Sequence, residues 1–180
     1  ITRKLSRDLH TADTLIVCDS YDKIIEIIKR LSNVINFFTV IGVDSSKKED
    51  VYNNVFESTG ISIFQPNNIE KIIKNYSTII NTMEEISFDI GNIRNQSIII
   101  DFSCNKPFKN IINSKKNCIY VEDINFIVSG YNDWVKEYIS PELFEGLMEE
   151  DTKFCQIYTN KDYYYLDDYI KNKIKIKGRI

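Results

Sequence analysis

Residues 14 to 31 read Thr-Leu-Ile-Val-Cys-Asp-Ser-Tyr-Asp-Lys-Ile-Ile-Glu-Ile-Ile-Lys-Arg-Leu, and their hydrophobic pattern changes partway along. Thr14 to Val17 is a short apolar run rich in β-branched residues, which is typical of a strand buried on both faces. After Asp22 the apolar residues recur at three- and four-residue steps, which places them on one face of a helix. The turn therefore lies between Cys18 and Asp22, and the stretch predicts the opening of a βαβ unit.

The same alternation of strand and helix continues over about 110 residues. Such a pattern predicts a parallel sheet with helices on both faces, and right-handed crossovers leave few topologies open. We expect an α/β fold of three layers, a doubly wound parallel sheet with the strand order 3-2-1-4-5-6. The remaining strands are expected at Asn36 to Ile41, Ile61 to Phe64, Thr78 to Asn81, Ser97 to Phe102 and Cys118 to Val121. Helices are expected after Ser45 or Ser46 up to Gly60, from Asn67 or Asn68 to Tyr76, and from Pro107 to Ile112.

The two ends of the chain differ from this central part. Residues 1–13 form a polar leader, residues 14–130 the predicted domain, and residues 131–180 an appendage of helices and a β-hairpin. The hairpin is expected from Phe154 to Tyr158 and from Tyr163 to Leu166, and a last helix from Asp168 to Ile174. The appendage is rich in aromatic residues, so we expect a homodimer through it.

Composition narrows the classes of function. The 180 residues carry a net charge of −3, which gives no reason to expect nucleic acid or an anionic membrane as a partner. No apolar run approaches the ~20 residues that span a bilayer, and no secretory signal opens the sequence, so we expect a cytoplasmic protein. The four cysteines, Cys18, Cys104, Cys118 and Cys155, lack metal-ligand spacing, and His10 is the one histidine. We therefore expect buried free thiols and no metal site.

Polar residues that follow the strands are the candidates for a binding site, because ligands of such sheets bind at the carboxyl ends of the strands. In the turn Asp19 to Asp22, the N–H groups near Ser20 and Tyr21 would meet the pyrophosphate of a dinucleotide. The alternative is a well-capped helix, since two carboxylates repel a diphosphate and side chains block the close approach that glycine allows.

Two further polar segments would meet the same ligand. After the second strand, Asp44 suits the ribose hydroxyls of NAD, whereas Ser45 and Lys47 suit the 2′-phosphate of NADP. The alternative there is a capped helix start with a solvated charge run. After the fourth and fifth strands, polar side chains of the segments Asn81-Thr82-Met83 and Asp101 to Ser103 would face a nicotinamide or a substrate, or else form hydrogen bonds at the strand ends.

Residues 14 to 127 resemble the nucleotide-binding domain of the glutamyl-tRNA reductase and shikimate dehydrogenase group. The resemblance is strongest in Ile98-Ile-Ile-Asp-Phe-Ser-Cys-Asn-Lys-Pro107, followed by Ile119-Tyr-Val-Glu-Asp-Ile124. Thr78-Ile-Ile-Asn-Thr82 is similar to the strand beside the nicotinamide, and Asp44-Ser-Ser-Lys-Lys48 to the segment that holds the adenine ribose. The resemblance implies a Rossmann-like domain that binds NADP or NAD, although Cys18-Asp-Ser-Tyr-Asp22 replaces the glycine-rich turn of that group. The resemblance does not extend to the separate catalytic domain of that group.

Three hypotheses follow. The first is an NAD(P)-binding Rossmann-like domain descended from a tetrapyrrole- or shikimate-type reductase, for which the sequence identifies no catalytic residue. The second is a non-catalytic interaction or dimerisation module of the same fold that binds no dinucleotide. The third is an enzyme that binds another nucleotide-like ligand, with the acidic turn contacting a ribose or a cationic group.

Overall fold

The computed structural model describes residues 13–33, 35–110, 118–128, 152–159, 162–165 and 168–169. The chain divides into two compact units, Ile1–Glu122 and Asp123–Ile180. Each unit carries a sheet of its own. The division comes earlier in the chain than the boundary at residue 130 that the sequence suggests.

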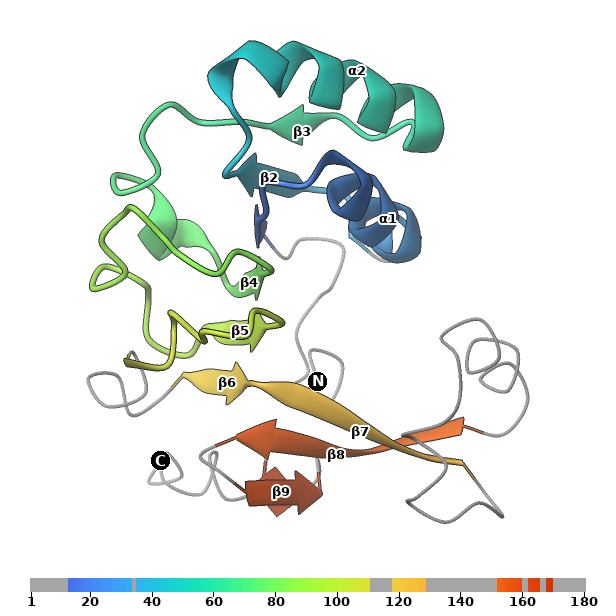
Figure 1. Ribbon diagram of the computed structural model, residues 1–180, viewed down its shortest axis with the longest axis vertical. Coiled ribbons are helices and arrows are strands. Elements are labelled where there is room, and N and C mark those ends of the chain that lie inside the picture. The colour runs from blue at the N-terminus through green and yellow to red at the C-terminus, as the bar shows by residue number, and fades with distance from the viewer. Residues whose placement is uncertain are drawn as a thin grey trace, which may run out of the picture. The chain divides into compact units, whose positions relative to one another are not determined.

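The sheet of the first unit has six strands in the order β3-β2-β1-β4-β5-β6, and every pair within it is parallel (Figure 1). This confirms the predicted doubly wound arrangement. β1 lies between β2 and β4, so the winding reverses at β1. The strands are β1 Thr14–Val17, β2 Phe38–Ile41, β3 Ile63–Phe64, β4 Thr78–Asn81, β5 Ile98–Asp101 and β6 Ile119–Val121.

Two helices cover one face of this sheet. Helix α1 spans Tyr21–Leu31, and helix α2 spans Lys48–Thr59 after a short 3₁₀ turn, η2, at Ser45–Lys47. Gly60 ends α2 in the left-handed conformation, with φ 71°, as the sequence predicts. The apolar faces of α1 and α2 pack with the strands in one buried cluster, which includes Ile16, Ile24, Ile28, Val40, Val51 and Val55.

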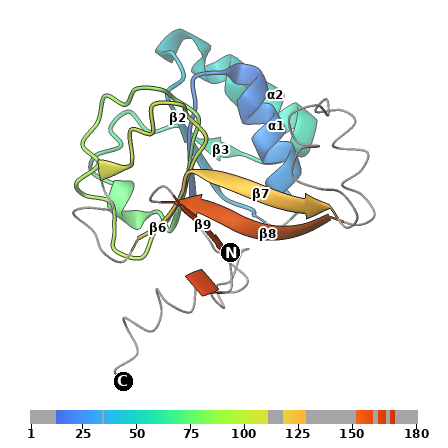
Figure 2. The same cartoon turned by 60° about the horizontal axis from the view of Figure 1, so that its bottom comes forward.

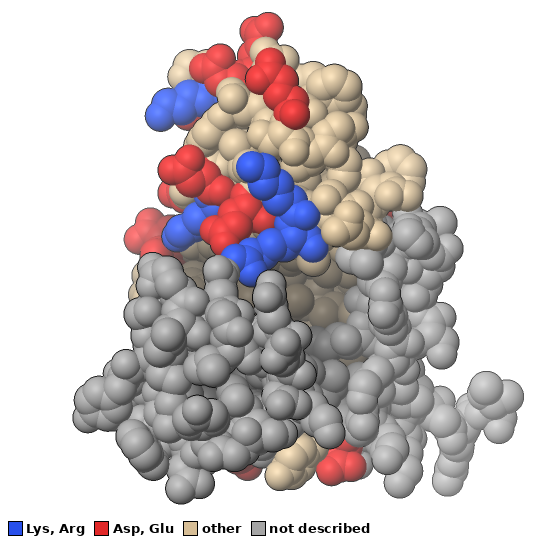
Figure 3. Space-filling view, turned by 90° about the vertical axis from the view of Figure 1, so that its right-hand side faces the viewer, with Lys and Arg blue, Asp and Glu red and all other residues tan. Residues whose placement is uncertain are grey.

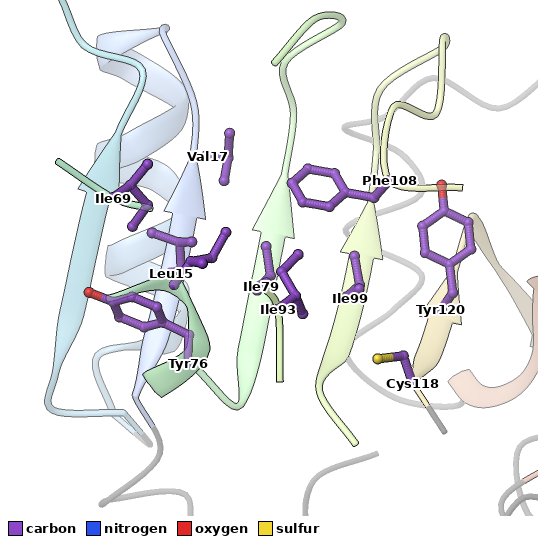
Figure 4. Close-up of a cluster of buried hydrophobic side chains, with 11 residues drawn as sticks. Leu15, Val17, Ile69, Tyr76, Ile79, Ile93, Ile99, Phe108, Cys118 and Tyr120 are labelled. Carbon is purple, nitrogen blue, oxygen red and sulfur yellow. The ribbon is translucent and has the colours of Figure 1, made fainter. Parts of the chain in front are cut away.

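The opposite face is covered by loops and a short 3₁₀ turn. A second buried cluster lies there, with Leu15, Ile79, Ile99 and Tyr120 from the strands (Figure 4). The helix predicted from Asn67 or Asn68 to Tyr76 is wrong, because this segment forms turns and the 3₁₀ turn η3 at Ile73–Asn75. Its hydrogen bonds include Ile72 N–H to the Ile69 carbonyl and Asn75 N–H to the Ile72 carbonyl. This tighter winding still buries Ile69, Ile73 and Tyr76.

The second unit contains an antiparallel sheet in the order β7-β8-β9. β7 is Asp123–Val128, β8 is Thr152–Thr159 and β9 is Asp162–Tyr165. Figure 2 shows β7 and β8 side by side. The predicted hairpin is confirmed, whereas the strand β7 was not predicted. The leader up to residue 12, the predicted helices between residues 131 and 151, and all but residues 168 and 169 of the last helix lie outside the described residues.

Charges of both signs occur on the surface. On the side shown in Figure 3, acidic and basic side chains of the described residues are interspersed. Glu26 and Arg30 of α1 form an exposed ion pair of 2.9 Å. Within the described ranges, no helix has the length and apolar character that crossing a membrane requires. The expected absence of nucleic acid and membrane partners stays a prediction.

Candidate functional site

A cavity of about 410 Å³ opens at the carboxyl ends of β1 and β2. Val17 ends β1, Gly42 follows β2, and Met83 follows β4, and all three line the cavity. It therefore lies where the winding of the sheet reverses, which is the usual ligand position in open α/β sheets. The other residues that line it are Ile41, Val43, Lys48, Pro66, Asn67, Asn68, Ile69, Glu70, Ile86, Ser87 and Phe88.

The turn before α1 is acidic. Ser20 occupies the N-cap position of α1 without a side-chain hydrogen bond to the helix, and its carbonyl accepts from the Ile24 N–H. Partial desolvation, followed by the carboxylates of Asp22, Asp50 and Glu57, raises the pKa of Tyr21. This negative environment opposes a diphosphate at the helix N-terminus. Neither Ser20 nor Tyr21 lines the cavity, and their role in binding a cofactor stays a prediction.

The segment after β2 is a capped turn. The Asp44 carboxylate accepts hydrogen bonds from Ser46 N at 2.8 Å and from Ser46 Oγ at 2.6 Å. These bonds lower the pKa of Asp44. Asp44 is thus the N-cap of η2, the position for which the sequence suggests Ser45 or Ser46. Asp44, Ser45 and Lys47 are exposed and do not line the cavity, and their contact with a cofactor stays a prediction.

Lys48 is the basic residue that does line the cavity. Its Nζ lies 3.4 Å from the Pro66 carbonyl and 3.3 Å from Asn67 Oδ1. Gln65 Nε2 donates to the Lys48 carbonyl at 2.7 Å, which fixes the start of α2 against the segment after β3. The ammonium group is therefore held at the cavity by two uncharged acceptors. A bound anionic group could replace these weak contacts with a charge-assisted hydrogen bond.

Asn81 is fully buried at the end of β4. Its Oδ1 accepts from Met83 N at 3.1 Å, and its Nδ2 donates to the Met83 carbonyl at 2.9 Å. Nδ2 also donates to Asp101 Oδ1 at 2.8 Å. Thr82 donates its backbone N–H to the Val17 carbonyl, and its Oγ1 is buried with no hydrogen-bond partner among the described residues. Both side chains stand beside the cavity rather than in its wall.

The carboxylate of Asp101 is the centre of a buried polar network at the ends of β4, β5 and β6. Its Oδ1 accepts from Ser103 Oγ at 2.6 Å and Ser103 N at 3.2 Å, in addition to Asn81. Its Oδ2 accepts from Tyr120 Oη at 2.9 Å and Phe108 N at 3.4 Å. Both oxygens are therefore engaged, as the strand-end interpretation of this segment expects.

Tyr120 and Lys106 close the same network. The Tyr120 side chain runs toward the carboxyl end of the sheet (Figure 4). Burial, and then the neighbouring Asp101 carboxylate, strongly raise the pKa of Tyr120, so its hydroxyl stays protonated and donates. Lys106 Nζ donates to the carbonyls of Asp101 at 2.6 Å and Glu122 at 2.7 Å. The ammonium group thus joins the last carbonyl of β5 to the residue after β6.

An exposed contact joins the loops after β4 and β5. The Glu84 carboxylate accepts from Cys104 N at 3.0 Å and Asn105 N at 2.8 Å. These backbone hydrogen bonds are the main reason that the pKa of Glu84 is lowered, and Lys106 contributes. Cys104 is exposed, so the expectation of buried thiols is wrong for it, whereas Cys18 and Cys118 are buried, and the Cys118 thiol donates to the Arg94 carbonyl at 3.6 Å. Within the described ranges, no group of three potential metal ligands occurs.

Sequence reasoning missed Gly42 as a cavity residue, whereas Lys48 and Met83 belong to the candidate segments Asp44 to Lys48 and Asn81 to Met83 without being singled out there. Gly42 carried a signal, because a glycine directly after a strand often marks a close approach of backbone. Its φ is 102°, which disfavours other residues. Met83 is the apolar residue two positions after β4, in a loop that otherwise begins with polar residues.

No protein-family model and no curated protein matches the chain. Among solved structures, it is similar to Thermococcus litoralis Δ1-pyrroline-2-carboxylate reductase in complex with NADH and L-proline, with 14% identity, TM-score 0.44, and coverage of 53% of this chain and 30% of that one. It is similar to L-tryptophan dehydrogenase from Nostoc punctiforme, with 16% identity, TM-score 0.45, and coverage of 68% and 37%.

A third similar structure is a 6-phospho-α-glucosidase from gut microorganisms in complex with NAD and Mn²⁺, with 11% identity, TM-score 0.45, and coverage of 93% of this chain and 51% of that one. The chain therefore spans between 30% and 51% of the length of these three proteins. At TM-scores below 0.5, these similarities carry no conclusion about the ligand or the activity of this chain.

Proposed function

We propose that the first unit is an NAD(P)-binding domain whose nucleotide occupies the cavity at the ends of β1 and β2. The observation that carries the proposal is the position of this cavity at the reversal of the winding, next to the end of β1. Its volume of about 410 Å³ falls in the usual range of small-molecule pockets. The apolar part of its wall, which includes Ile41, Val43 and Ile86, suits a nucleotide base, and its polar part includes Lys48 and Glu70.

Lys48 supports NADP over NAD as the cofactor. Its ammonium group lines the cavity, where the 2′-phosphate of an adenosine would lie. Asp44, the residue that would hold the ribose hydroxyls of NAD, instead uses its carboxylate to cap η2. The acidic turn Asp19 to Asp22 weakens the site for the pyrophosphate, so the adenosine end supplies most of the affinity in this proposal.

Equilibrium dialysis and the fluorescence of the reduced cofactor test the proposal. NADPH is expected to bind, AMP is expected to compete with it, and nicotinamide mononucleotide is expected not to compete. Absence of binding at millimolar NADPH and NADH would end the cofactor proposal and leave the fold unchanged. The descent from a tetrapyrrole- or shikimate-type reductase is part of the same proposal and rests on Ile98 to Pro107. It identifies no catalytic residue.

A second candidate is a dimerisation module of this fold that binds no dinucleotide. Two observations favour it: the carboxylates of Asp19 and Asp22 at the turn before α1, and the exposure of Tyr163 and Tyr165. Side chains two residues apart point to the same face of a strand, so these tyrosines share one face of β9. Light scattering tests it: Tyr163→Ser with Tyr165→Ser would reduce the dimer, while Tyr52→Ser on α2 would not. A strict monomer at high protein concentration would contradict it.

A further inference from the structure

Met83 lies directly over the backbone that follows β2. A Cβ atom placed on Gly42 would come within 2.5 Å of Met83 Sδ and 2.8 Å of the Cys18 carbonyl oxygen. The thioether therefore rests on Gly42, which is exposed, and Met83 and Gly42 both line the cavity with Val17. Since Val17 ends β1 and Gly42 follows β2, Met83 lies in the cavity wall together with both of these strand ends.

The backbone of Met83 is held by a single side chain. The Asn81 amide accepts from the Met83 N–H and donates to the Met83 carbonyl, at 3.1 and 2.9 Å. Its other hydrogen points to Asp101 Oδ1 at 2.8 Å, with Ser103 Oγ 3.4 Å away. An Asn side chain has two N–H donors and a carbonyl oxygen with two lone pairs, so these contacts use both donors and one lone pair. Asn81 has no N–H left for a ligand, which favours an indirect role.

We propose that Met83 is the surface on which the base of the bound nucleotide packs, and that Asn81 is the positioning residue that holds Met83 there. This inference rests on the proposed function. A thioether is polarisable and makes favourable contacts with aromatic rings. Val43, Ile86 and Phe88 line the same cavity and supply further apolar surface. The buried Asp101 carboxylate contributes by fixing Asn81 rather than by touching the ligand.

Nuclear magnetic resonance of methyl-labelled methionine tests the first half of the inference. The chain has two methionines, Met83 and Met148, so Met83→Leu assigns the signals. Titration with AMP is expected to move the Met83 methyl signal through the ring current of the base. The movement should saturate at the dissociation constant that dialysis gives. Binding of AMP by dialysis with an unmoved Met83 signal would overturn the inference and leave the proposed function standing. No binding at all would overturn both.

Affinity measurements test the second half. Met83→Ala removes the contact with the base and should weaken AMP binding about three- to tenfold. Asn81→Ala should weaken it by a similar factor and broaden the Met83 methyl signal in the free protein. Tyr120→Phe is the matched control, because it removes a hydrogen bond from Asp101 but leaves both bonds between Asn81 and Met83. It should lower stability and leave the affinity for AMP unchanged. A folded Asn81→Ala variant with unchanged affinity for AMP would overturn the positioning role of Asn81. If Asn81→Ala does not fold, Met83→Ala still tests the contact with the base, and unchanged affinity for AMP in that variant would overturn the inference.

Discussion

The two halves of the carboxyl edge of the sheet differ in how their polar groups are used. At the ends of β5 and β6, Asp101, Ser103 and Tyr120 bond to one another and fill the interior. At the ends of β1 and β2 the edge is hollow, and apolar side chains supply much of its lining. The closed half is thus the one whose carboxylate, hydroxyl and phenol groups would suggest a catalytic site from the sequence. A carboxylate whose two oxygens are engaged inside the protein holds loops in place, and the open half is where a ligand has room.

The closed half should respond most strongly to mutation. Asp101→Ala leaves the donors of Asn81, Ser103 and Tyr120 buried without their acceptor, and each such group costs about 1–3 kcal/mol. We expect the free energy of unfolding to fall by about 3 kcal/mol or more. Urea denaturation measures it. The exposed Asp89→Ala, which removes two local hydrogen bonds, from Gly91 N and Asn92 Nδ2, is the control and should have a much smaller effect. Equal losses would mean that the network is not a centre of stability.

In the open half, adding a side chain at Gly42 should lower the free energy of unfolding. Gly42→Ala combines a φ of 102° with a Cβ that would meet the Cys18 carbonyl oxygen at 2.8 Å. Such backbone strain costs about 1–3 kcal/mol, and the added methyl group displaces Met83 from its place on the cavity wall. Gly60→Ala is the matched control, because its φ is also positive, at 71°, but nothing lies within 4 Å of the new Cβ. The excess loss at Gly42 over Gly60, measured by urea denaturation, reports the close approach. Equal losses for Gly42→Ala and Gly60→Ala would contradict the close approach of Gly42 to Met83 and Cys18.

The fold could be predicted because it depends on patterns along the chain. The apolar runs Thr14–Val17 and Thr78–Asn81 are β1 and β4 with the predicted bounds, and their alternation with amphipathic segments dictates the sheet order. The segment Asn67 to Tyr76 failed as a helix because its apolar residues fit two kinds of winding. The 3₁₀ turn buries the same side chains, so periodicity could not separate the two.

The site was harder to predict because it depends on which side chains meet across loops. Asp44 and Asn81 have the residue types of cofactor contacts, yet the structure shows their polar groups bonded to Ser46 and Met83. Lys48 differs from Lys47 by one position in the chain, and only the start of α2 determines which of them reaches the cavity. Such choices depend on three-dimensional contacts that a single sequence does not encode locally.

The affinities of Lys47 and Lys48 variants for NADPH and NADH test which of the two lysines contacts the cofactor. Lys48→Gln removes the charge at the cavity, and we expect NADPH to bind several-fold to about tenfold more weakly. NADH, which lacks the 2′-phosphate, should bind as before. Lys47→Gln removes an adjacent exposed charge that does not line the cavity, and it should change neither affinity. Dialysis with both cofactors measures the ratio. If Lys48→Gln weakens NADPH and NADH equally, Lys48 does not select the phosphate.

The smallest expected effect concerns the exposed bond that joins the loops of the closed half. The folded protein lowers the pKa of Glu84 below its ordinary value of 4.5, because the ionised carboxylate accepts from Cys104 N and Asn105 N. A group with a lowered pKa stabilises the fold above its unfolded pKa, and this contribution is lost as the pH falls through the folded value. Unfolding midpoints measured from neutral pH down through this window should therefore decline less steeply in Glu84→Gln than in the natural sequence. Glu85→Gln, which removes the neighbouring carboxylate of the same loop, is the matched control. Identical slopes for the natural sequence and Glu84→Gln would mean that the hydrogen bonds of the Glu84 carboxylate do not stabilise the contact between the two loops.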